Sequence, residues 1–213
     1  LFEVDVAAFL RENELTSRIP KKEAGIAREA DAAVHRRPDY HAEEIARREE
    51  EAFARGVSAI QAVAPELTVE RRRPTEELLP ELLAVEEAAF PAETRYDEKA
   101  FRARFIQQNA ELLLLRREGA LIGFALTFTS PLQPSNELYL DDIALLPAYQ
   151  SRGLGSAILK TLTALATVHG YTSLHALVQP GPESRRLVQF YERNGLHSTG
   201  DFRGLGLRIE KLL

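Results

Sequence analysis

The feature that most constrains the fold of this chain is a glycine-rich turn between a predicted strand and a predicted helix. The strand reads ELYLDDIALL, the turn Gln-Ser-Arg-Gly-Leu-Gly occupies residues 150–155, and an amphipathic helix is predicted over 153–168. Gly153 and Gly155 let the backbone turn tightly and approach a ligand without interference from a Cβ atom. The amides of the first helical turn and the helix dipole favour an anion there. The spacing differs from dinucleotide-binding and P-loop glycine motifs, and such a turn can also serve only to pack a helix on a sheet.

The two ends of the chain carry different patterns. Residues 1–66 are charged and rich in alanine, with helices predicted near 2–12, over about 21–36 and after Asp39. In the last of these helices an apolar stripe at helical spacing comprises Ile45, Ala52, Phe53, Val57, Ile60 and Ala64. Strand and helix patterns alternate in the remainder. We therefore expect a helical N-terminal region, 1–66, followed by a second domain, 67–213.

The second region predicts an α/β fold with a mixed sheet. ELLLLRR and ALIGFALTFTS flank a Glu118-Gly119 turn, which indicates a β-hairpin. Further strands are predicted at LTVERR, ELYLDDIALL, YTSLHALV and twice near the C-terminus. Helices are predicted at 75–89, about 97–108, 153–168 and 183–194.

Composition argues against several classes of function. The 213 residues contain no cysteine, which rules out disulfides, thiolate nucleophiles and cysteine-ligated zinc and fits a reducing cytoplasm. A formal net charge of −5 argues against general nucleic-acid binding. No apolar run approaches the roughly 18 residues that a membrane span requires. We therefore expect no membrane partner. The 5 histidines show no ligand spacing with carboxylates, so we also expect no metal.

The glycine turn and a second motif together resemble the GNAT N-acetyltransferase superfamily. Its hallmark is Gln/Arg-x-x-Gly-x-Gly/Ala between the fourth strand and the following helix, and residues 150–155 match it. Residues 190–196, Phe-Tyr-Glu-Arg-Asn-Gly-Leu, are similar to the family's Phe-Tyr-x-x-x-Gly-Phe segment, and LHALVQP would be the fifth strand. The resemblance covers about 67–213. It implies a mixed, mainly antiparallel central sheet flanked by helices, and acetyl-CoA as the acyl donor.

The resemblance also implies where acetyl-CoA binds. The pyrophosphate would lie on the amides of residues 151–156, and the pantetheine arm would pair like an added strand with the backbone of 143–145. Such pairing requires the fourth and fifth strands to splay apart. Ser184 stands where the family often has an asparagine that contacts the cofactor arm. The implied cofactor-binding residues are Ile143, Ala144, Leu145, Gln150, Ser151, Arg152, Gly153, Leu154, Gly155, Ser156 and Ser184.

Two further residues are implied to be catalytic. In the family, the tyrosine matching Tyr191 protonates the leaving thiolate, and in polyamine N-acetyltransferases the acid matching Asp141 takes the amine proton through water. The residues themselves leave other interpretations open, since Tyr191 can simply pack in the core and Asp141 can pair with an arginine. Asp142 or a water molecule is an alternative base. Strict alternation puts Asp141 and Asp142 on opposite faces of the strand, although a bulge, expected from the family, would change that.

The sequence does not name the acceptor. In the family, loops that fall here at about 90–97 and 129–136 help to build the acceptor pocket, and acids such as Glu93 and Asp97 would favour a cationic amine. We expect direct attack by a small-molecule primary amine. A protein N-terminus or lysine side chain is the alternative acceptor, and a non-catalytic acyl-CoA sensor is a third interpretation. Region 1–66 could regulate the enzyme, form a homodimer or cover the pocket.

Overall fold

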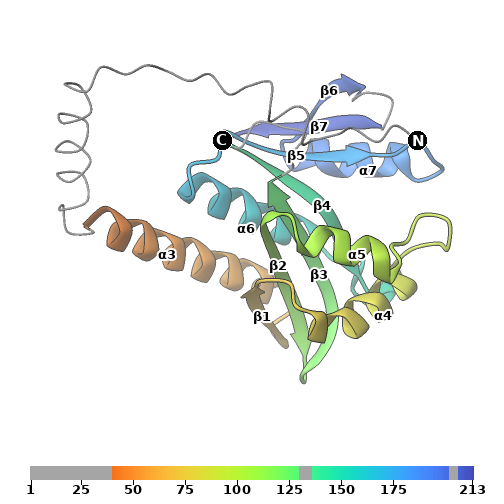
Figure 1. Ribbon diagram of the computed structural model, residues 1–213, viewed down its shortest axis with the longest axis horizontal. Coiled ribbons are helices and arrows are strands. Elements are labelled where there is room, and N and C mark those ends of the chain that lie inside the picture. Colours follow the sequence, from red (N-terminus) through yellow and green to blue (C-terminus); the bar gives the residue numbers. More distant parts are fainter. Residues whose placement is uncertain (1–39, 130–135, 202–205) are drawn as a thin grey trace, which may run out of the picture. The chain divides into compact units, whose positions relative to one another are not determined.

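The computed structural model of the chain describes residues 40–129, 136–201 and 206–213 (Figure 1). The helices predicted near 2–12 and 21–36, and nearly all of the loop 129–136, lie outside these ranges. The chain divides into two compact units, Leu1–Glu43 and Glu44–Leu213, and the second contains the sheet and the candidate site.

The described residues form one sheet of seven strands. They are β1 (Leu67–Arg72), β2 (Gln108–Arg117), β3 (Ala120–Thr129), β4 (Glu137–Leu145), β5 (Ser173–Val178), β6 (His197–Asp201) and β7 (Leu207–Leu212). Their spatial order is β1-β2-β3-β4-β5-β7-β6. Within the described part, β4 and β5 pair in parallel and all other neighbours are antiparallel. The predicted mixed, mainly antiparallel sheet is therefore confirmed.

Helices cover both faces of this sheet (Figure 1). They are α3 (Tyr40–Val63), α4 (Leu79–Ala89), α5 (Glu98–Phe105), α6 (Leu154–Val168) and α7 (Ser184–Arg193), with short 3-10 turns η1 (Glu76–Leu78) and η2 (Pro147–Tyr149). One hydrophobic core lies under α6 and includes residues of α3, and α7 packs against it. A second core lies under α4 and α5. The helices predicted after residue 39 are all present, with ends shifted by a few residues.

Burial on both sides explains the run of leucines in β2. Leu112 and Leu114 belong to the core under α4 and α5, whereas Leu113 and Leu115 belong to the core under α6. A strand covered on both faces needs apolar residues at every position, so it shows no alternation.

Helix α3 packs closely against α6. Ala52, Ile60 and Ala64 of the predicted apolar stripe are buried. Gly56 lies on the same face, where a Cβ atom would stand 2.3 Å from Cγ2 of Thr161 in α6. The missing side chain lets the two helices approach, and α3 thereby shares the core of the sheet.

Strands β4 and β5 separate halfway along their length. They pair over residues 137–140 of β4 and 173–176 of β5, and β4 then continues to Leu145 beside β3. The register between β3 and β4 skips Asp141, which makes this residue a β-bulge. The splay that the resemblance implies is therefore present, and the bulge lies where it begins.

Candidate active site

The glycine turn joins β4 to α6 as a tightly closed loop. Gly153 has a φ of 93°, in the left-handed region that glycine adopts most readily, and Ser151 has a φ of 58°. Nε2 of Gln150 donates a 2.8 Å hydrogen bond to the carbonyl of Leu145, which ties the loop to the end of β4. The first N–H groups of an α-helix have no acceptor within the helix and carry the positive end of its dipole. The predicted anion-binding residues, 150–156, thus form the loop at the open end of β4 and the first turn of α6.

The two sequence motifs meet in space. Gly155 in α6 faces α7, and a Cβ atom at this position would lie 3.1 Å from the ring of Phe190. Nη2 of Arg186 in α7 donates a 3.1 Å hydrogen bond to Oγ of Ser151. Helix α7 therefore contacts the glycine loop, although the two motifs are far apart in the chain.

Helix α7 carries Ser184 at its start and Tyr191 in its last turns. Oγ of Ser184 donates a 2.8 Å hydrogen bond to the carbonyl of Gly181. Tyr191 contacts Phe190 edge to face and packs against the core under α6. Leu187, one turn before Tyr191, is 42% exposed. Part of the apolar face of α7 is therefore left uncovered.

Asp141 is held by α5 and the loop before it. Its side chain is 3% exposed, and Oδ2 accepts a 2.5 Å hydrogen bond from Nε of Arg104. The Tyr96 hydroxyl donates to Oδ1 at 3.5 Å, and the guanidinium of Arg104 lies 3.7 Å from the centre of the Tyr96 ring. Burial raises the pKa of Asp141, and the charge of Arg104 opposes that rise. Asp141 is thus an ion-paired carboxylate on the sheet face that α4 and α5 cover.

Asp142 lies on the same face as Asp141, because the bulge interrupts the alternation of β4. Its carboxyl group lies near that of Glu86 in α4 and is affected by its charge. The expectation of opposite faces, which rested on strict alternation, is therefore wrong. Burial and the neighbouring Glu86 raise the pKa of Asp142 well above its ordinary value.

Glu86 is a site residue that sequence reasoning missed. It is 1% exposed, and its Oε1 accepts a 2.7 Å hydrogen bond from the backbone N–H of Tyr96. Burial raises the pKa of Glu86, and the Tyr96 N–H opposes this. A signal existed in the sequence, because Leu79, Leu82 and Glu86 follow helical spacing and the acid occupies a position where an apolar residue is expected.

The phenol of Tyr191 lies within electrostatic range of both aspartates. Burial, and then the charges of Asp142 and Asp141, raise the pKa of Tyr191 above its ordinary value. The hydroxyl therefore stays protonated at neutral pH, which is the state that a proton donor needs.

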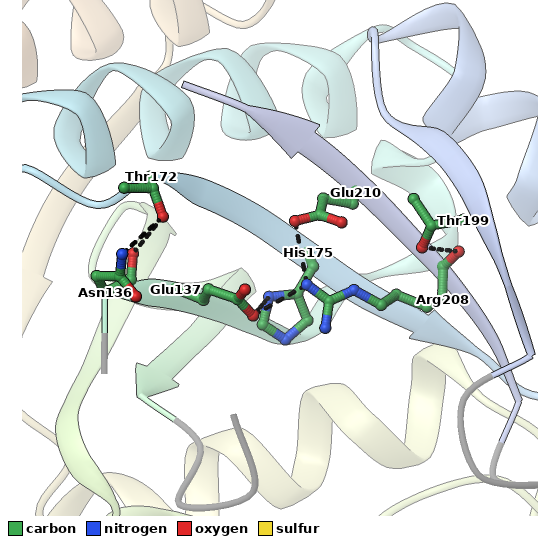
Figure 2. A network of polar contacts seen from close by, with 7 residues as sticks. All are labelled: Asn136, Glu137, Thr172, His175, Thr199, Arg208 and Glu210. Carbon is green, nitrogen blue, oxygen red and sulfur yellow. Dashed lines mark hydrogen bonds and ion pairs between the residues drawn. The ribbon is translucent and has the colours of Figure 1, made fainter. Parts of the chain in front are cut away.

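A cluster of polar side chains lies on the same sheet face as Asp141, across β4, β5 and β7 (Figure 2); it comprises Glu137, His175, Arg208 and Glu210. His175 is 0% exposed, stacks on Tyr139 at 5.2 Å, and has no hydrogen-bond partner for either ring nitrogen among the described residues. Burial lowers the pKa of His175 to about 4, so its imidazole is neutral at pH 7. Nη2 of Arg208 donates to Glu137 at 2.9 Å and to Glu210 at 3.1 Å. In the sequence, the only signal for this group is a histidine within an apolar strand.

Two negative findings concern the part of the chain that the structure describes. No group of three or more His, Asp or Glu side chains there is placed to hold a metal ion. None of the described helices combines the length and the apolar character needed to cross a membrane.

Comparison with known proteins gives a family match and a set of similar folds. The Acetyltransferase (GNAT) family matches residues 76–196. The PaiA N-acetyltransferase of Thermoplasma acidophilum, solved with coenzyme A, has a TM-score of 0.55 and 17% identity, covering 68% of this chain and 99% of its own. The ribosomal-protein-S18-alanine N-acetyltransferase of Escherichia coli has a TM-score of 0.52 and 22% identity, covering 68% of this chain and 93% of its own. The GNAT domain of S. lividans PAT has a TM-score of 0.55 and 19% identity, covering 68% of this chain and 90% of its own.

Proposed function

This chain belongs to the Acetyltransferase (GNAT) family and is an acyltransferase that takes its acetyl group from acetyl-CoA, and on that premise we propose that it acetylates a primary amine by direct attack. One observation carries the proposal. The glycine loop contacts the helix of Tyr191, at the end of β4 that has separated from β5. This arrangement combines an anion-binding loop, an open strand edge and a protonated phenol.

We propose that acetyl-CoA is held by the residues that the resemblance implies. The N–H groups of 151–156 receive the pyrophosphate, and Arg152 adds a positive charge beside it. The backbone of 143–145 has no β5 partner among the described residues, which leaves hydrogen-bonding groups for the pantetheine arm. The hydroxyl of Ser184 keeps acceptor lone pairs for the same arm. When bound, acetyl-CoA supplies the activated acetyl group.

The proposed chemistry uses two protonatable side chains and the backbone. Asp141 accepts the amine proton, directly or through water, and its raised pKa makes it a stronger base than a solvated aspartate. The N–H groups of β4 polarise the carbonyl oxygen under attack. Tyr191, which burial keeps protonated, donates its proton to the leaving sulfur.

The charges around Asp141 favour a cationic acceptor. Several carboxyl groups of β4, β7 and α4 lie on this face, against the guanidinium groups of Arg104 and Arg208. The carboxyl groups are those of Glu86, Glu137, Asp141, Asp142 and Glu210. The side chain of Asp141, the proposed base, is only 3% exposed, so a compact amine can approach it more closely than an extended peptide can. We therefore propose a small-molecule primary amine as the acceptor.

A protein amine is the second candidate acceptor. Its support is the similar fold of the Escherichia coli enzyme, whose name assigns it to an alanine of ribosomal protein S18. The two candidates predict different results in a thiol-release assay: faster release with small amines for the first, and faster release with peptides for the second.

Calorimetric titration with acetyl-CoA, followed by a thiol-release assay, tests the proposal. We expect saturable one-to-one binding of acetyl-CoA and CoA, and none of ATP. Thiol release is then measured with polyamines, amino acids, aminoglycosides, and peptides that offer an N-terminal alanine or a lysine. The assay has no background from this cysteine-free protein.

Each outcome has a distinct meaning. A higher kcat/KM for small amines supports the proposal, whereas a higher value for peptides replaces the small acceptor by a protein one. Binding of acetyl-CoA without thiol release from any of these amines would contradict the proposed primary-amine acceptors. Absence of binding would mean either that the glycine loop only packs α6 on the sheet or that region 1–66 covers the site, and in both cases it would contradict the proposed acetyl-CoA site in this chain.

A further inference from the structure

Glu86 occupies a position in α4 where its charge is costly. The side chain is 1% exposed and lies on the helix face that Leu79 and Leu82 bury in the core under α4. An ionised carboxyl group in such surroundings must be paired, be hydrogen-bonded or take up a proton. Its partners therefore determine what the residue does.

The two oxygens of Glu86 have different neighbours. Oε1 accepts the 2.7 Å hydrogen bond from the Tyr96 N–H. Oε2 of Glu86 and Oδ2 of Asp142 are both shielded from solvent, and neither oxygen has a hydrogen-bond partner in the described part of the chain. The two carboxyl groups are nevertheless close enough for each to shift the pKa of the other. A single proton between them would satisfy both orphaned oxygens, since one group then donates and the other accepts.

We propose that Glu86 is a positioning residue that shares one proton with Asp142 and so fastens α4 and the loop 90–97 to the bulged end of β4. This inference rests on the proposed function, which makes Asp141 and that loop part of the acceptor site. With 1% exposure, Glu86 is not available to the substrate itself.

Glu86 influences the position of Asp141 through Tyr96. Glu86 fixes the Tyr96 backbone, the Tyr96 ring lies against the guanidinium of Arg104, and Arg104 holds the carboxylate of Asp141. Loss of the Glu86 contact therefore loosens the group proposed as the base, although Glu86 touches neither substrate nor cofactor.

The charged groups around the pair favour one shared proton. Glu86 and Asp142 face Asp141, Arg104 and Tyr96, and Tyr191 lies near Asp142. Asp141 and Arg104 offset each other, so loss of the shared proton would leave two negative charges in contact. Burial raises the pKa values of both members, and the charge of Glu86 raises that of Asp142 further.

The direction of the pH effect follows from these raised pKa values. Between the ordinary carboxyl range and the raised values, the folded protein binds more protons than the unfolded chain. Its stability therefore falls as the pH rises through that window. In Glu86→Gln, the amide oxygen still accepts from Tyr96, and the amide nitrogen can donate to Asp142 at every pH.

The experiment compares Glu86→Gln, Glu86→Leu and the neighbouring, exposed control Glu87→Gln with the wild type. We expect the Tm of Glu86→Gln minus that of the wild type to widen by roughly 3 °C or more as the pH rises from the ordinary carboxyl range through the raised pKa values. Glu87→Gln should follow the wild type. Glu86→Leu should raise KM for the amine and lower kcat, with a fall in kcat/KM of at least about tenfold, because it loses one buried hydrogen bond to the loop that also positions Asp141. Glu86→Gln should recover most of that loss.

Two results would overturn the proposal. A Tm difference between Glu86→Gln and the wild type that stays constant from the ordinary carboxyl range to the most alkaline pH at which the protein folds would show that no proton is shared. A KM in Glu86→Leu equal to the wild-type value would show that the residue does not position the loop. If the wild type acetylates no amine, the proposed function fails, and the Tm series still decides whether the proton is shared.

Discussion

At the scale of single residues, the hydroxyl of Tyr191 gives the most direct test of the mechanism. Tyr191→Phe keeps the ring that packs against Phe190 and removes only the proton donor. We expect turnover to fall at least about tenfold, which is below the usual contribution of a general acid. Affinity for acetyl-CoA, measured by calorimetry, should be nearly unchanged. Tyr171→Phe is the control, since that hydroxyl contacts Thr129 and Asn109 instead. Equal turnover in Tyr191→Phe and wild type would remove Tyr191 from the acid role.

Asp141 is tested by removing its charge and following the rate against pH. We expect Asp141→Asn to lower kcat about a hundredfold, as loss of a general base does. In the wild type, kcat should fall as the pH falls through the pKa of Asp141, which burial places above that of a solvated aspartate. In Asp141→Asn, kcat should not show this fall at acidic pH. If the fall disappears in Asp142→Asn but persists in Asp141→Asn, the base is Asp142.

The residues that the sequence singles out are those whose chemistry stands out locally, and their roles stay predictions. Tyr191 and the glycine loop lie in short motifs, and an acid in an apolar strand drew attention to Asp141. Glu86 could not be assigned in this way, because its partner Asp142 belongs to a strand far along the chain. The contact also depends on the bulge at Asp141, which alternation does not predict.

At the scale of elements, the start of α6 depends on the backbone of Gly153. Its φ of 93° is unfavourable for any residue with a side chain, although an added Cβ atom would come no closer than 3.9 Å to Val63. The left-handed conformation costs roughly 1–2 kcal/mol for a non-glycine residue. We expect Gly153→Ala to weaken acetyl-CoA binding at least about tenfold in calorimetry, because the loop shifts and the methyl group enters the proposed phosphate site.

A matched control exists in the hairpin between β2 and β3. Gly119 has a φ of 86° and open space around its Cβ position, so Gly119→Ala carries a similar backbone penalty. It should destabilise the protein without changing its affinity for acetyl-CoA. Equal loss of affinity in both variants would show that general destabilisation, and not the phosphate site, explains the effect at Gly153.

Element type was easier to predict than element contacts. The stripe of α3 indicated an amphipathic helix, but nothing in its spacing identified α6 as the partner, and the close approach at Gly56 became apparent only from the neighbouring Thr161. The splay of β4 from β5 came from the family resemblance and not from the residues, because a strand that loses its partner keeps the same apolar pattern.

At the scale of the whole molecule, the proposed cofactor site joins segments that are separated in the chain. Hydrogen exchange with and without acetyl-CoA can test these segments together. Binding at about a hundred times Kd adds roughly 2.7 kcal/mol to the free energy of unfolding, which slows exchange wherever opening requires release of the ligand. We expect slower exchange at 143–145, at 151–156 and in α7.

The pattern of protection separates the parts of the proposal. Strands β1 and β6 lie at the two edges of the sheet and should change least. Protection limited to 151–156 would retain the anion site and remove the strand-like pairing along β4. Protection that includes 143–145 but omits α7 would place the acyl chain away from Tyr191, and the proton for the leaving sulfur would then have to come from another group.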